Sequence, residues 1–268
     1  MPDYHRILIT GAAGSLGGHL RTGLTHLADR IRLVDIKDMG PAAPHEELVV
    51  CNLADKAAAL DATRDCDAIL HFAGHPREQS FEEIVADTLP AAYHVYEGAR
   101  RHGCKRIVCA SSIHAVGFHP VEEVPDTRVR HRPDTFYGLT KTFVEDLASL
   151  YWDKFGLETV ALRICSCFPE PKDRRMLWSW LSFADCVRLA EAALTAPRVG
   201  FSVIYGTSDN AQRGVSNARA AHIGFRPRDS ADAFAAAVFA RTQRPDPAAV
   251  ATRVVGGSFA ASAHPDDG

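Results

Sequence analysis

The sequence lacks the features that mark nucleic-acid-binding and membrane-spanning proteins. Its formal net charge is only -3 at pH 7, so it has no excess of basic residues to attract a polyanion. No apolar run approaches the roughly 18 residues that a membrane span needs. The N-terminus reaches a strand-like segment within a few residues, which leaves no room for a signal peptide. We therefore expect a cytoplasmic protein that binds neither nucleic acid nor a membrane.

Patterns typical of metal sites are also missing. The seven cysteines form no C-x-x-C pair, and the thirteen histidines include no H-E-x-x-H motif. The short run Cys165-Ser166-Cys167 would supply only two soft ligands, with no histidine pair beside them. We expect no metal and reduced, mostly buried thiols.

What the chain does contain is enough apolar sequence for one large domain. Its 268 residues are 46% hydrophobic, which favours a large core. Strands are predicted at 6–10, 31–34, 47–50, 67–72, 105–110 and 158–164, and helices at 15–29, 80–102 and 137–155. Pro90 should kink or divide the second helix. The alternation predicts an α/β fold, a Rossmann-type doubly wound parallel sheet with helices on both faces.

The first predicted strand leads directly into a glycine-rich turn. Glycines at this position allow a tight turn and a close approach of the backbone to a pyrophosphate, and free N–H groups at the helix start bind phosphates. The residues expected there are Gly11, Gly14, Ser15, Leu16 and Gly17. Asp35 ends the next strand, where a carboxylate accepts hydrogen bonds from a ribose and repels a 2′-phosphate. NAD is therefore favoured over NADP, although nearby Lys37 weakens that preference.

Further cofactor contacts are expected at the carboxyl ends of the other strands. Asn52 and Leu53 follow the third strand, where sheets of this kind form one wall of an adenine pocket. Small residues after the fourth strand let the backbone approach the cofactor. The remaining expected contacts are Phe72, Ala73, Gly74, Ser111, Tyr137, Lys141 and Ile164. His71 is expected to be a packed, hydrogen-bonded core residue.

A tyrosine and a lysine four residues apart supply the candidate chemistry. On a helix, Tyr137 and Lys141 leave the same face one turn apart, and a nearby ammonium group favours the phenolate that a general base needs. Ser112, at the end of the fifth strand, can hold the substrate oxygen. Tyr-x-x-x-Lys alone is weak, because any helix with a core aromatic residue and a solvated lysine contains it.

Taken together, these motifs resemble those of a known superfamily. The T-G-A-A-G-x-L-G turn, Asp35, the Ala110-Ser111-Ser112 strand end and Tyr137-Gly138-Leu139-Thr140-Lys141 resemble the extended short-chain dehydrogenase/reductase superfamily over residues 1–165. Residues 163–171, 175–177 and 256–259 are similar to the uronate dehydrogenase family. The resemblance implies a single domain, 1–268, in which residues 1–165 mainly bind NAD and 166–268 mainly form a small C-terminal substrate-binding lobe and tail. We also expect a homo-oligomer.

The resemblance implies a reaction and a role for each site residue. That family oxidises the anomeric carbon of a hexuronic acid, such as galacturonate or glucuronate, to an aldaro-lactone with hydride transfer to NAD. Ser112 would orient the C1 hydroxyl, Tyr137 would take its proton, and Lys141 would bind the nicotinamide ribose. Arg175 would clamp the substrate carboxylate with two parallel hydrogen bonds. The expected substrate contacts are Pro76, Ser112, Ile113, Tyr137, Ser166, Arg175 and Phe259. Phe259 could equally anchor the tail.

Departures from the family pattern leave the substrate preference open. Thr88 stands where many relatives have an asparagine, and Ile113 and Pro76 stand where polar side chains can occur. Two other functions share some of these features. A nucleotide-sugar epimerase or dehydratase needs a larger C-terminal lobe, and a non-catalytic NAD-sensing protein often lacks the catalytic tyrosine.

Overall fold

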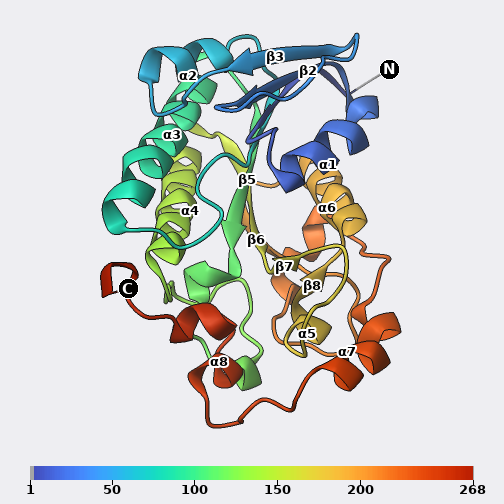
Figure 1. Cartoon of the computed structure of the whole chain (residues 1–268). Coiled ribbons are helices and arrows are strands. Elements are labelled where there is room, and N and C mark those ends of the chain that lie inside the picture. The colour runs from blue at the N-terminus through green and yellow to red at the C-terminus, as the bar shows by residue number, and fades with distance from the viewer. Residues whose placement is uncertain (1–2, 268) are drawn as a thin grey trace.

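The predicted strands come together in one parallel sheet. The computed structural model describes residues 3–267 and contains a seven-stranded sheet (Figure 1). Its strands, in spatial order, are β3 (Glu46–Val50), β2 (Ala28–Asp35), β1 (Tyr4–Thr10), β4 (Ala68–His71), β5 (Arg106–Ser112), β6 (Glu158–Ile164) and β9 (Phe201–Gly206). All neighbouring strands run parallel, which confirms the predicted doubly wound fold class.

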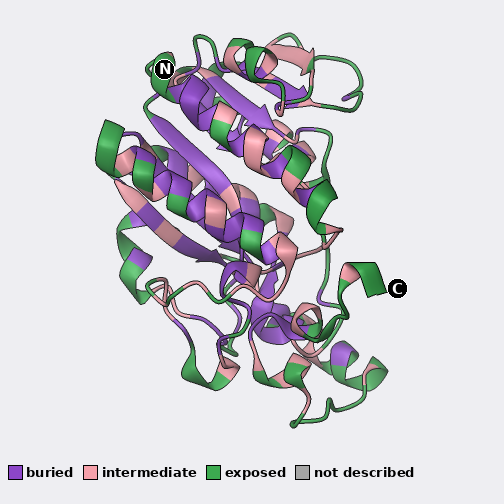
Figure 2. Cartoon of the chain, turned by 90° about the vertical axis from the view of Figure 1, so that its left-hand side faces the viewer, coloured by how far each residue is buried: buried purple, intermediate pink, exposed green. Residues whose placement is uncertain are grey.

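Helices cover both faces of the sheet. One face carries α1 (Ser15–Gly23) and α6 (Phe183–Thr195), and the other carries α2 (Lys56–Ala62), α3 (Phe81–Arg101) and α4 (Phe136–Phe155) (Figure 1). Successive residues of a strand point to opposite faces, so Ile7 and Ile9 pack under α1 and α6 while Leu8 packs under α2–α4. Figure 2 shows the strands buried behind helices whose outer faces are exposed.

The first helix ends earlier than predicted. α1 stops at Gly23 and is followed by a 3₁₀ turn, Thr25–Leu27, before β2 begins. Gly23 lies so close to α6 that a Cβ there would be 2.5 Å from Cγ1 of Val187. Leu24 and Leu27 are buried although neither lies in the α-helix. Leucine spacing therefore located the buried face correctly but could not locate the helix end.

Proline does not divide the long helix. α3 is continuous from Phe81 to Arg101 with Pro90 inside it, so Pro90 does not divide the helix, and the alternative of a kink stays a prediction. Buried side chains lie on both sides of the proline, including Ile84, Ala92 and Val95. Packing of this face against the sheet outweighs the loss of one helical hydrogen bond.

A smaller region lies beyond the carboxyl ends of the strands. It contains β7 (Ser166–Cys167), α5 (Met176–Ser179), β8 (Trp180–Leu181), α7 (Ala235–Arg241) and α8 (Val250–Arg253) (Figure 1). A cluster of Met176, Leu177, Trp180 and Val238 forms part of its own core. Because α6 and β9 belong to the main sheet layer, the sheet continues past residue 165. Among residues 3–267, no helix is both long and apolar enough to cross a membrane.

Candidate active site

The glycine turn has the geometry of a phosphate cradle. Gly11 has a φ of 71°, and a Cβ there would lie 2.8 Å from the backbone of Phe72. A Cβ on Gly17 would lie 2.2 Å from the carbonyl oxygen of Gly11, so only glycine lets α1 begin this close to the turn. Gly14 caps α1 without a side chain, and the first turn of this helix has no acidic residue. The N–H groups of Ser15 and Leu16 therefore lie at the positive end of the α1 dipole, which no carboxylate in the first turn neutralises. A dinucleotide pyrophosphate would bind at this helix end.

Asp35 lies beside this turn. Its carboxylate accepts hydrogen bonds from the N–H groups of Ala13 and Lys37, both at 3.0 Å. These two contacts hold the carboxylate at the carboxyl end of β2, next to the cradle. The arrangement fits a ribose acceptor.

The remaining expected cofactor residues line the same sheet edge. The Oγ1 atom of Thr10 accepts the N–H groups of Phe72 and Ala73, each at 3.1 Å, and so fixes the chain after β4. Leu53 is buried, and the side chain of Asn52 lies 3.4 Å from the carboxylate of Asp87. Gly74 follows with a φ of 137°. In contrast, the Ile164 side chain packs in the core of the sheet, which leaves its backbone for any cofactor contact.

His71 is a buried core residue, as expected. Its Nδ1 atom lies 2.9 Å from Oγ1 of Thr10. Burial, helped by the positive charge of Lys141, lowers the pKa of His71 to about 3. The ring is therefore neutral at physiological pH.

The catalytic candidates converge at the end of β5. This strand runs through Ser112, two residues beyond its predicted end, and the Oγ atom of Ser112 accepts the N–H of His114 at 3.2 Å. Tyr137 and Lys141 lie one turn apart on α4, with Nζ of Lys141 5.2 Å from the centre of the tyrosine ring. The same ammonium donates to the carbonyl of Ala110 at 3.0 Å, just before the two serines.

Ser111 points into a different network. Its hydroxyl donates to the buried carboxylate of Glu145 at 2.5 Å, so its side chain is already engaged and its backbone is left for the cofactor. Arg163 donates two hydrogen bonds to Glu145, at 2.9 and 2.8 Å, and His131 lies 2.8 Å away. Burial would raise the pKa of Glu145, but the hydrogen bonds from His131 and Arg163 lower it to about 2. Glu145 stands four residues after Lys141, a helical spacing that could have revealed it.

Arg175 is a half-buried cation among neutral acceptors. It donates to Ser166 Oγ at 3.1 Å, to Ser179 Oγ at 3.4 Å and to the carbonyl of Val255 at 3.2 Å. No carboxylate in the described part of the chain forms an ion pair with it. Burial accordingly lowers the pKa of Arg175 from its ordinary value. Its charge and its N–H donors would suit an anion that binds beside it.

A C-terminal segment connects Arg175 to Tyr137. A Cβ on Gly257, which has a φ of 67°, would lie 2.5 Å from Nε of Arg175, so this segment lies directly on the guanidinium. Two residues later, the ring of Phe259 stacks on His114 with centroids 4.2 Å apart and lies 6.5 Å from the ring of Tyr137. The structure thus brings the expected residues Ser166, Arg175, Phe259 and Tyr137 into one region.

His114 and Asp134 belong to the same region but were not predicted. The carboxylate of Asp134 has no solvent exposure and lies 2.8 Å from Nδ1 of His114. The His114 ring meets Tyr137 edge-on, with centroids 5.8 Å apart. Asp134 would keep the Nδ1 proton of the imidazole in place, which leaves Nε2 free to accept a hydrogen bond. The only sequence signal was a histidine two residues after Ser112.

Two of the residues expected to contact the substrate have surroundings unlike those of Ser166, Arg175 and Phe259. The side chain of Ile113 is fully buried in a cluster with Trp178 and Val255, so it faces the protein interior. Pro76 is exposed in the segment between β4 and α3. Thr88, the departure on α3, has a buried hydroxyl without a partner that faces Gly74.

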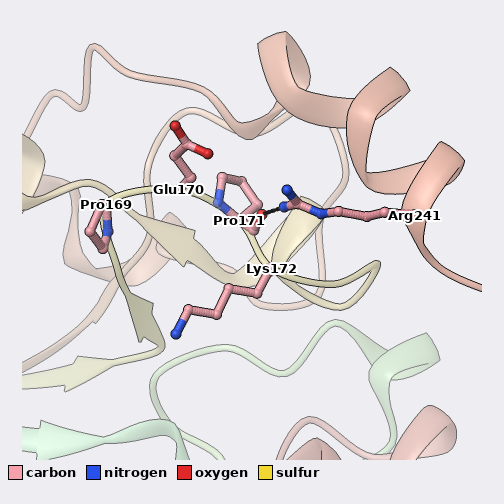
Figure 3. A pocket seen from close by; sticks show the side chains of 5 residues that line it. All are labelled: Pro169, Glu170, Pro171, Lys172 and Arg241. Carbon is pink, nitrogen blue, oxygen red and sulfur yellow. Dashed lines mark hydrogen bonds between the residues drawn. The ribbon is translucent and has the colours of Figure 1, made fainter.

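Of two surface hollows, the first lies outside this region and the second is lined in part by Asp134. One, of about 260 Å³, is lined by Pro169, Glu170, Pro171, Lys172 and Arg241, and the Arg241 guanidinium turns toward the carbonyl of Pro171 (Figure 3). It contains none of the expected site residues. The other, of about 400 Å³, lies at the start of α4 and is bordered by Glu78, Phe136 and His264.

Comparison with known proteins gives a family and full-length relatives. Residues 7–182 match the NAD dependent epimerase/dehydratase family. The chain is 48% identical over 260 residues to uronate dehydrogenase from Pseudomonas putida, with 96% of each chain covered. Glucuronic acid dehydrogenase from Chromohalobacter salexigens is a solved structure with 44% identity and a TM-score of 0.96, covering 99% of this chain and 100% of that one. Uronate dehydrogenase from Agrobacterium tumefaciens, solved as a tyrosine-to-alanine variant complexed with NAD, has 42% identity and a TM-score of 0.93, covering 97% of this chain and 98% of that one.

Proposed function

This chain belongs to the uronate dehydrogenases within the NAD dependent epimerase/dehydratase family, and on that premise we propose that it oxidises the C1 hydroxyl of hexuronic acids to an aldaro-lactone. Galacturonate and glucuronate are the expected substrates. The cofactor is NAD, which supplies the hydride acceptor when bound. The glycine cradle and Asp35 fit this cofactor, and the carboxylate of Asp35 would repel the 2′-phosphate of NADP.

The observation that carries the proposal is the unpaired guanidinium of Arg175. A uronate differs from its parent hexose by one carboxylate, so selectivity for the acid needs a positive partner where that group binds. Arg175 offers its charge near Ser166 and beneath the segment that leads to Phe259. A site for a neutral sugar would gain nothing from a desolvated cation.

The same geometry supports a division of labour in the proton transfer. Ser112 holds the C1 hydroxyl while the phenolate of Tyr137 takes its proton, and the electron pair of the C1–H bond leaves as hydride. The C1–O bond thereby becomes the carbonyl of the lactone. The ammonium of Lys141 lies 5.2 Å from the centre of the Tyr137 ring, and its contact with the carbonyl of Ala110 leaves two N–H donors for the nicotinamide ribose.

Two aromatic groups complete the proposed sugar site. Phe259 presents a ring to an apolar sugar face, and its stacking on His114 holds that ring in place. His114, oriented by Asp134, can accept a hydrogen bond from a sugar hydroxyl. Ser166 adds a hydroxyl beside Arg175.

The two alternative functions, a nucleotide-sugar epimerase and a non-catalytic NAD-sensing protein, account for fewer of these observations. A nucleotide-sugar epimerase uses the same fold, but the full-length relatives at 42–48% identity are named as dehydrogenases of uronic acids. A non-catalytic NAD-sensing protein has no need for a tyrosine, lysine and serine held together at one sheet edge.

We further propose that the protein is a cytoplasmic homo-oligomer. Helices α3 and α4 lie side by side (Figure 1). Both leave large apolar side chains exposed, which a second copy could cover. These side chains are Phe81 and Tyr93 on α3 and Leu139, Leu150 and Phe155 on α4. The seven free cysteines are compatible with a reducing compartment.

The test follows the absorbance of the reduced cofactor. The purified chain is incubated with NAD and galacturonate, glucuronate, galactose or UDP-galactose. We expect cofactor reduction with both uronates, much slower reduction with galactose, and none with UDP-galactose. Absence of cofactor reduction with every uronate, in a preparation that binds NAD, would contradict the proposal.

A further inference from the structure

Glu78 holds the backbone of the catalytic tyrosine. One oxygen of its carboxylate accepts the N–H of Tyr137 at 2.7 Å, and the other accepts the N–H of Phe136 at 2.9 Å. Glu78 is half-buried in the segment between β4 and α3, far from α4 in sequence. Hydrogen bonds from N–H groups to a carboxylate are stronger than those between neutral partners.

These contacts complete the start of α4. The first four N–H groups of a helix have no partner inside it. Thr135 satisfies one of them, because its hydroxyl accepts the N–H of Gly138 at 2.9 Å, and its carbonyl accepts the first bond inside the helix, from the N–H of Leu139. Glu78 satisfies two more, and its carboxylate lies at the positive end of the helix.

The segment that supplies Glu78 also borders the cofactor and substrate region. Residues 74–80 begin at Gly74, after β4, and include Pro76. At the other end of the segment, Ser80 caps α3, and the ring of Phe81 meets that of Phe136 with centroids 5.4 Å apart. Movement of this segment would therefore pull on the backbone that carries the Tyr137 phenol.

We propose that Glu78 is a positioning residue that couples the 74–80 segment to Tyr137. This inference rests on the proposed function of Tyr137 as the base. Glu78 does not need to touch the substrate. It fixes the distance between the 74–80 segment and the helix that carries the phenol, so both move together.

The test compares Glu78→Ala with the matched control Ser80→Ala. Both changes remove a helix-capping side chain of the same segment, but only the first releases Tyr137. We expect Glu78→Ala to lower kcat for galacturonate by about 10- to 100-fold, because small misplacements of a catalytic group have effects of this size. The dissociation constant for NAD should stay unchanged, and Ser80→Ala should keep kcat and KM within about twofold. Glu78→Gln, which retains one acceptor oxygen, should recover part of the loss.

Hydrogen exchange gives a readout that does not require turnover. In Glu78→Ala, amide exchange should rise both in residues 74–80 and at the start of α4, whereas Ser80→Ala should raise it only around the start of α3. Equal kinetics and equal exchange in the two variants would overturn the coupling. If wild type fails to oxidise uronates, the proposed function is wrong, and the exchange pattern alone then decides the coupling. If Glu78→Ala does not fold, the same comparison is made with Glu78→Gln.

Discussion

Replacing Arg175 by alanine tests the substrate class most directly. The guanidinium contacts Ser166, Ser179 and the carbonyl of Val255, none of which carries a charge. Loss of one partner of a desolvated charged pair costs about 2–5 kcal/mol, which corresponds to a loss of about 30-fold to several thousand-fold in kcat/KM for a uronate. Galactose has no carboxylate, so its kcat/KM should fall much less.

The stability of the free protein should respond differently from catalysis. In the absence of substrate, no carboxylate of residues 3–267 forms an ion pair with Arg175, and burial lowers the pKa of its guanidinium from the ordinary value. Arg175→Ala removes four hydrogen bonds to uncharged acceptors but also removes the cost of burying the guanidinium, so the change in unfolding free energy should be within about 1–2 kcal/mol. Thermal unfolding with and without galacturonate measures this, and only wild type should be stabilised by the ligand.

Arg174 provides the matched control. It donates to Thr242 and lies over the ring of Phe239, with its guanidinium 4.9 Å from the ring centre. Arg174→Ala should therefore keep the ratio of uronate to galactose kcat/KM. Arg175→Lys should recover only part of the uronate activity, because an ammonium group cannot make paired parallel hydrogen bonds. Equal losses for uronate and galactose in Arg175→Ala would refute the carboxylate clamp.

Three further changes test other parts of the site. Tyr137→Phe should lower kcat by at least about 100-fold with little effect on NAD binding, because it removes the general base, and near-normal steady-state turnover would contradict that role. Asp35→Ala should shift the ratio of kcat/KM for NAD and NADP toward NADP, and an unchanged ratio would place Asp35 away from the ribose. Glu145→Gln should make the free energy of unfolding depend less on pH between about pH 4.3 and pH 2. The folded pKa of Glu145 is lowered to about 2, so its contribution to stability is complete above the ordinary carboxyl pKa and is lost as the pH falls. An equally steep acid transition in wild type and variant would contradict this contribution of Glu145 to stability.

Six of the seven strands could be predicted, because each has a short apolar run of its own in the sequence. The apolar runs around Ile7, Ile69 and Val108 are short and buried on both faces, and each is followed by small or polar residues at the sheet edge. The end of α1 and the continuity of α3 through Pro90 could not be predicted, because both depend on packing against distant elements. β9 carries no motif and joins the sheet only through its pairing with β6.

The candidate site also contains residues that a local motif predicts and residues that it does not. Tyr137, Lys141 and Ser112 could be proposed as site residues because they stand at fixed spacings in a known motif. Glu78 and Asp134 could not be found, because their partners lie far away in sequence or act through the backbone. Ile113 follows Ser112 directly, yet the turn after β5 rotates its side chain into the interior.

The short segment from Val255 to Phe259 has a consequence for the order in which activity arises during synthesis. Every strand of the sheet precedes this segment, so the cradle, Asp35 and the Tyr137 helix can form on the ribosome before it appears. Its later docking on Arg175 and His114 then brings the ring of Phe259 beside Tyr137, where the proposed sugar site lies. A growing chain could thus hold its cofactor before it can recognise a substrate.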